Sequence, residues 1–71
     1  MMNIRENDFY KEIENDGFKL IGMSGKSYKG KNNYTFSAKD IIIEREGYKV
    51  HAQVISRKGI IIAYRILDVN F

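Results

Sequence analysis

The chain has 71 residues, contains no cysteine and one histidine, and carries a formal net charge of +3 at pH 7. This length suits one domain, residues 1–71, and the missing cysteines exclude a disulfide-stapled scaffold. One histidine without cysteine also excludes a zinc site built from nitrogen and sulfur ligands, so we expect neither a metal nor a cofactor.

Charge is distributed unevenly along the chain. Residues 1–16 hold five acidic and two basic side chains, whereas residues 17–39 hold five lysines and no acidic residue. Because local potential steers the encounter with a charged partner, the basic middle of the chain is the first candidate for a contact surface. Whether the acidic start also forms a contact stays open.

No segment of the sequence is typical of export or of a membrane span. The first residues are polar, and the longest uninterrupted apolar stretch, 60–64, is far too short to cross a bilayer. The absence of cysteine favours a reducing compartment. We therefore expect a protein of the bacterial cytoplasm without membrane contact. Abundant isoleucine, lysine and asparagine are typical of a low-GC bacterium or its phage.

The first predicted element is a helix over about 7–16. Three apolar residues stand three or four positions apart and share one helix face: Phe9, Tyr10 and Ile13. Asn7 or Asp8 can cap its start, and Gly17 suits the left-handed position that follows a helix. Acidic residues near its end oppose the helix dipole, so a basic neighbour is expected there.

After the helix the sequence is typical of strands, which predicts a β-rich region over 18–69. The predicted strands are 18–23, 34–38, 41–45, 48–55 and 60–69. Lys39 and Asp40 interrupt the alternation and predict a bulge or a tight corner. Short turns are expected at 46–47 and 57–59. The fourth strand has the clearest alternation, with these inward positions: Tyr48, Val50, Ala52 and Val54.

The last predicted strand is apolar on both faces. One face carries Ile60, Ile62, Tyr64 and Ile66, and the other carries Ile61, Ala63, Leu67 and Val69. Such an antiparallel sheet needs cover on both sides, and one short helix covers one. We therefore expect an α+β fold: a short N-terminal helix followed by a 4-5-stranded antiparallel sheet that is strongly curved or barrel-like, unless another chain covers it. A homo-oligomer is one such solution, since a domain of this size gains little net stability from its core.

The segment 24–34 is predicted to be a basic loop between the first two strands. Lysines neutralise acidic or phosphate groups, and tyrosines are rigid anchors in binding sites, although the same composition is typical of a solvated loop. A phosphate-binding loop is excluded, because Leu20 stands where that motif needs its first glycine. The predicted partner-binding residues are Lys26, Tyr28, Lys29, Lys31 and Tyr34, joined by Arg57 and Lys58 if the two hairpins converge.

No pattern of residues points to catalysis. His51 is the single histidine, and it lies at an outward position of a predicted strand, where no partner for acid–base chemistry can be identified. The acidic residues show no pair at catalytic spacing. We therefore expect no catalytic residue and no enzyme.

The sequence thus favours a small non-enzymatic protein-interaction module with a protein partner. We expect it to occlude a surface of a host nucleic-acid-handling or defence system, in the manner of a phage or mobile-element inhibitor or adaptor. Two alternatives stay open. One is direct nucleic-acid binding through the basic loop 24–34, and the other is a structural subunit of a homo-oligomer.

Overall fold

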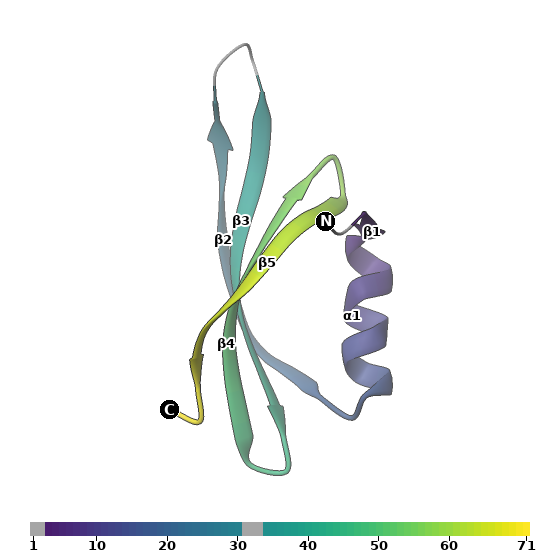
Figure 1. The fold of residues 1–71 in the computed structure, drawn as a ribbon, viewed down its shortest axis with the longest axis vertical. Coiled ribbons are helices and arrows are strands. Elements are labelled where there is room, and N and C mark those ends of the chain that lie inside the picture. The colour runs from purple at the N-terminus through teal and green to yellow at the C-terminus, as the bar shows by residue number, and fades with distance from the viewer. Residues whose placement is uncertain (1–2, 31–33) are drawn as a thin grey trace.

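One helix and a single antiparallel sheet make up the part of the chain that the structure describes. The computed structural model describes residues 3–30 and 34–71, and the strand order is β1-β5-β4-β3-β2 (Figure 1). The elements are β1 Ile4–Arg5, α1 Glu6–Asn15, β2 Lys19–Lys29, β3 Thr35–Arg45, β4 Tyr48–Arg57 and β5 Ile60–Val69. The α+β class, with its short N-terminal helix, is therefore confirmed.

The sheet is open, so the expected barrel-like closure is wrong. β2 lies at one end of the strand order and the two-residue β1 at the other, and no pairing joins these ends within residues 3–30 and 34–71. Figure 1 shows α1 along one side of the sheet. α1 packs on the core face, so the sheet does not have to close on itself to cover that face. Apolar side chains that a barrel would enclose therefore stay half exposed on β5, among them Tyr64 and Ile66 at 52% each.

The helix begins earlier than the sequence predicts. Arg5 occupies the cap position with an extended backbone and makes no side-chain cap bond, so the expected caps at Asn7 and Asp8 are wrong. The end of the helix agrees with expectation, because Gly17 has a φ of 90°. The basic neighbour is Arg45, whose Nη1 donates to the Asp16 carbonyl oxygen at 2.8 Å.

The expected loop 24–34 is instead largely strand. β2 continues through Lys29 and pairs with β3 along its whole length, and β3 runs without a break through Lys39 and Asp40. The corner predicted at these two residues is therefore wrong. Pairing satisfies backbone groups that a long loop would leave to water. The irregularity lies in β2 instead, between Leu20 and Gly22.

The core lies between α1 and one face of the sheet. Phe9, Tyr10 and Ile13 of α1 pack against it, as the helical spacing predicts. The buried apolar residues are Ile41, Ile43, Val50, Ala52, Val54 and Ile61, and Ser56 is buried beside them. The alternation of β4 is thus confirmed at three of its four inward positions. The exception is Tyr48, which is 45% exposed because it stands at the first position of β4, beside the turn.

The faces of β5 differ from the prediction. The register between β4 and β5 shifts twice, and Ile62 and Leu67 are the extra residues of these shifts. Each extra residue reverses the alternation that follows it. Ile61 and Tyr64 consequently share the core face, opposite Ser56 and Val54, although the sequence assigns them to opposite faces.

Candidate binding surface

Three aromatic rings gather at the free end of the β2–β3 hairpin. Tyr28 of β2 pairs directly with Phe36 of β3, and their rings stack at 5.2 Å between centroids and 17° between planes. Tyr34 adds a third ring, 6.1 Å from Phe36 at 46°. We call these rings, with Arg57 and Lys26, the aromatic face. By strand alternation it lies on the side of the sheet away from α1.

Arg57 joins β4 to this hairpin. Its Cζ lies 4.0 Å from the centroid of the Tyr34 ring, a cation–π contact. Its Nε is buried and has no hydrogen-bond partner within the described part of the chain. The guanidinium is therefore held by packing against the ring, which keeps Tyr34 in a fixed orientation. The β2–β3 and β4–β5 hairpins thus converge at Arg57. The sequence predicts Arg57 as a site residue on the condition that they do.

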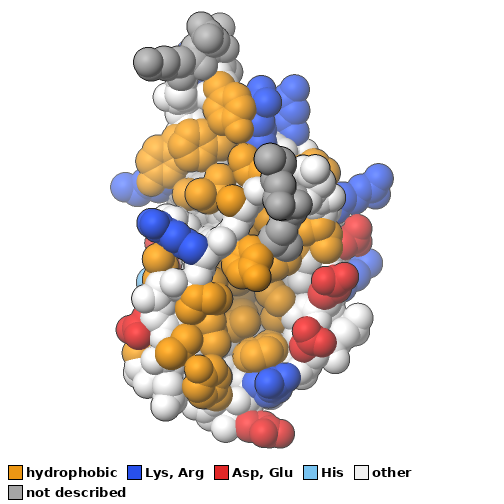
Figure 2. All heavy atoms as spheres, viewed as in Figure 1, with side chains coloured by type: hydrophobic (Ala, Val, Ile, Leu, Met, Phe, Trp, Pro, Cys, Tyr) orange, Lys and Arg blue, Asp and Glu red, His pale blue; other side chains and the backbone are white. Residues whose placement is uncertain are grey.

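The other predicted site residues do not form one patch. Lys26 pairs with Ala38 and lies on the aromatic face, whereas Lys29 pairs with Thr35 and lies on the opposite side. Lys58 stands in the β4–β5 turn with a φ of 53°. Lys31 lies outside the described residues. Figure 2 shows basic side chains around the upper hairpin and several acidic ones along the side where Figure 1 places α1.

Phe36 belongs to the aromatic face but is absent from the sequence prediction. The sequence places Tyr34 and Phe36 on one strand face, which the ring contact between them supports. It does not show that Tyr28 stacks on Phe36, because that contact depends on the hairpin register. Extending the predicted strand 18–23 through Lys29 would pair Tyr28 with Phe36 and so predict the stacking.

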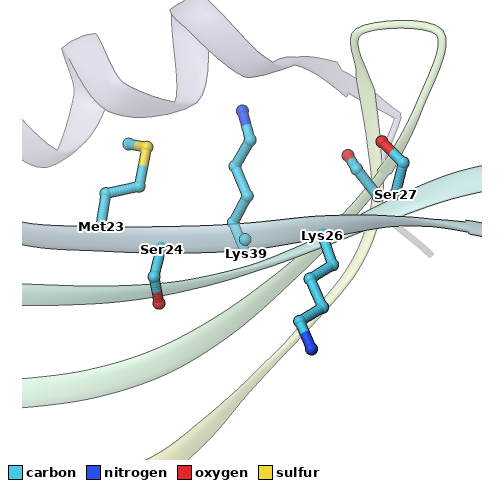
Figure 3. A pocket seen from close by; sticks show the side chains of 7 residues that line it. Met23, Ser24, Lys26, Ser27 and Lys39 are labelled. Carbon is cyan, nitrogen blue, oxygen red and sulfur yellow. The ribbon is translucent and has the colours of Figure 1, made fainter.

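An open depression of about 290 Å³ lies along β2 on the other side of the sheet. Figure 3 shows Met23 and Lys39 pointing toward α1, whereas Ser24 and Lys26 point the opposite way. Gly25 makes room for Lys39, since a Cβ at Gly25 would lie 2.7 Å from Lys39 Cγ. The glycine therefore lets the lysine side chain cross the sheet surface to reach the helix.

Lys39 ends in an ion pair beneath α1. Its Nζ donates to Glu6 Oε2, and this hydrogen bond raises the pKa of Lys39. Burial, reinforced by the charge of Glu6, raises the pKa of Tyr10. The Tyr10 hydroxyl is buried without a hydrogen-bond partner among the described residues. The ion pair between Lys39 and Glu6 attaches the start of α1 to the middle of the sheet.

The raised pKa values predict alkaline destabilisation of the fold. The folded state holds the protons of Lys39 and Tyr10 more tightly, so their contribution is complete below pH 10 and falls as the pH rises through 10.0 and 10.5, the ordinary values for tyrosine and lysine. Lys39→Met is expected to cost about 1 kcal/mol at pH 7. Because the charge of Lys39 opposes the rise in the Tyr10 pKa, the alkaline loss is expected to flatten in the double variant Lys39→Met/Tyr10→Phe, which lacks both groups. Urea unfolding at pH 7 and above pH 10.5 measures both, with the exposed Lys19→Met as control. An unchanged alkaline slope in the double variant would contradict the assignment to Lys39 and Tyr10.

The single histidine has an acidic neighbour on the far face. His51 Nε2 lies 3.6 Å from Asp40 Oδ1, beyond hydrogen-bond distance, and its ring meets Phe71 edge-on at 6.1 Å. Among the described residues, no group of three or more side chains is arranged to hold a metal ion. None of the helical segments in residues 3–30 and 34–71 is long and apolar enough to cross a membrane.

Comparison with known proteins gives no relative. Models of protein families, curated proteins and solved structures were all searched, and none matches this chain. Function is therefore inferred from the surfaces of the molecule, and first from the aromatic face, where side chains pack most closely.

Proposed function

We propose that this chain is a non-enzymatic protein-interaction module that binds its partner through the aromatic face. The observation that supports the proposal is the row of packed groups at the free end of the hairpin. There Tyr28 stacks on Phe36, Phe36 contacts Tyr34, and Arg57 covers Tyr34. Tyrosine and arginine are enriched among the residues that carry binding energy at protein interfaces.

The packing of the rings favours a protein partner over a nucleic acid. Single-stranded nucleic acid binds by stacking successive bases on free ring faces. Here Phe36 contacts both tyrosine rings, and Arg57 occupies a face of Tyr34. Tyr28, at 45% exposed, keeps the most accessible ring. Because the side chains of the aromatic face are already packed, they lose little freedom on binding. The aromatic face therefore suits a protein surface that is apolar and acidic.

The positive charge on the aromatic face favours a partner surface with negative charge. Lys26 and Arg57 are the basic residues of the aromatic face, whereas Lys29 lies on the opposite side of the sheet and Lys39 is paired with Glu6. A partner surface with exposed carboxylates would be attracted to this region and would associate faster at low salt. We propose that, through such a contact, a phage or mobile-element protein acts as an inhibitor or adaptor of a host system that handles nucleic acid.

Direct nucleic-acid binding is the second candidate, supported by Lys26 and Arg57 beside the aromatic rings. A pull-down with tagged protein from bacterial lysate, with and without nuclease, separates the two. The first candidate predicts that the captured protein persists after nuclease treatment, and that a labelled random oligonucleotide is not bound at about 0.15 M salt. Loss of capture with nuclease, together with oligonucleotide binding that falls steeply with salt, would support the second candidate and contradict the first.

A further inference from the structure

The outer edge of β5 is largely unpaired. β1 covers it at two positions, where Ile4 pairs with Ile61 and Arg5 with Ile60. From Ile62 to Val69, none of the residues that the structure describes pairs with this edge. Backbone amide and carbonyl groups along such an edge offer a template for another strand.

This edge lacks the charges that usually prevent strand pairing. At the other end of the sheet, β2 carries lysines at 19, 26 and 29, which protect an edge strand from pairing. The segment 62–69 has no lysine, proline or glycine, and its charged residues are Arg65 and Asp68. The two ends of the sheet therefore differ in charge, while register shifts occur in both edge strands.

We propose that the free edge of β5 binds the same edge of a second copy of this chain, antiparallel, about a two-fold axis near Ile66 and Leu67. The proposal goes beyond the binding function of the aromatic face, which lies at a different part of the molecule. The two charged residues of the segment, Arg65 and Asp68, support this register. In this arrangement Arg65 of each copy lies beside the partner's Asp68, which gives two opposite-charge contacts for one self-complementary edge.

The register with β4 places both charges on one face. Arg65 pairs with Gln53 and Asp68 with His51, and Leu67 is the extra residue that brings positions 65 and 68 to the same side. Within the chain, Arg65 Nε donates to Gln53 Oε1 of β4 at 3.0 Å, and Asp68 Oδ1 accepts from the Val69 backbone N–H at 2.9 Å. Both charged residues thus lie on the face of the sheet away from α1.

The other face of the same edge is apolar and half exposed. Tyr64 pairs with Val54 and Val69 with Val50, so both lie on the core face, where they are 52% and 47% exposed. The pairing that joins the charges sets Tyr64 beside the partner's Val69. Figure 2 shows that hydrophobic side chains reach the surface through the middle of the molecule. A second copy would cover part of this apolar surface. Burying it would stabilise a domain of this size, whose own core contributes little net stability.

Charge-swap variants test the proposal by sedimentation equilibrium between about 1 and about 200 μM protein. The wild type is expected to form a dimer in this range. Arg65→Asp and Asp68→Arg each place like charges together and are expected to weaken dimerisation at least about tenfold. An equal mixture of the two variants is expected to dimerise again, because each introduced charge then meets its opposite.

Lys19→Glu, on the opposite edge strand β2, is the matched control and is expected to leave dimerisation unchanged. Far-UV circular dichroism shows whether each variant is folded, and these exposed positions are expected to tolerate the changes. A wild type that stays monomeric at the highest concentration would overturn the proposal. So would single variants that dimerise as well as the wild type, or a mixture that fails to restore the dimer that the single variants lose.

Discussion

Replacing Ile61 by alanine is expected to destabilise the fold by about 2–5 kcal/mol. Ile61 is 0% exposed and lies on the core face of β5, and its strand partners are Ser56 of β4 and Ile4 of β1. Deleting its side-chain atoms leaves a cavity where α1, β1 and the sheet meet. Since small domains are stable by only about 5–15 kcal/mol, this loss is a large fraction of the total.

Ile21→Ala is the matched control, because the residue type is the same and Ile21 is 50% exposed in β2. Its expected cost is within about 0.5 kcal/mol. Urea unfolding followed by circular dichroism, at one fixed protein concentration, measures both variants. Equal losses in the two variants, or a loss below about 1 kcal/mol for Ile61→Ala, would contradict the description of the core.

The sequence predicts β4 well and β5 poorly for one physical reason. Apolar and polar residues alternate along β4, so its buried face can be predicted at Val50, Ala52 and Val54. β5 is apolar at nearly every position, and no alternation marks where the chain adds an extra residue. The two register shifts are set by pairing with β4, which local sequence does not encode.

The hairpin formed by β2 and β3 shows the same limit. Glycines and lysines are depleted in strands, so 24–29 is expected to be a loop on local grounds. Thr35 and Phe36 of β3 are good strand formers, and pairing with them extends β2 to Lys29. Gly25, which the sequence treats as a loop residue, is needed where Lys39 crosses the sheet. Contacts across the hairpin thus outweigh the local preference.

The candidate site divides along similar lines. Tyr28 and Tyr34 can be selected from the sequence because they stand in a segment without acidic residues. The stacking of Phe36 and the position of Arg57 need the strand register, which is known only from the fold. The ion pair of Lys39 with Glu6 joins residues 33 positions apart, and no sequence pattern predicts it.

Replacing Tyr28 by alanine is expected to weaken binding of the captured protein partner by about 2 kcal/mol, or about 30-fold. The ring is 45% exposed and is held in place by stacking on Phe36, so it can enter a partner surface with little loss of freedom. Removing it also frees Phe36 to move, which adds to the effect. Titration of the wild type and the variant against the protein retained after nuclease treatment measures the difference.

Tyr48→Ala provides a close control, since Tyr48 is also 45% exposed but lies beside the β3–β4 turn, away from the aromatic face. Its affinity for the partner is expected to match the wild type. Tyr28→Phe keeps the stacked ring and is expected to keep most of the affinity, which separates the ring from its hydroxyl. If Tyr28→Ala and Tyr48→Ala bind equally well, the partner does not contact the aromatic face. If both variants lose affinity by a similar amount, their unfolding free energies are compared with that of the wild type. Lower values would indicate a general effect on the fold. Values equal to the wild type would contradict both that explanation and the proposed surface.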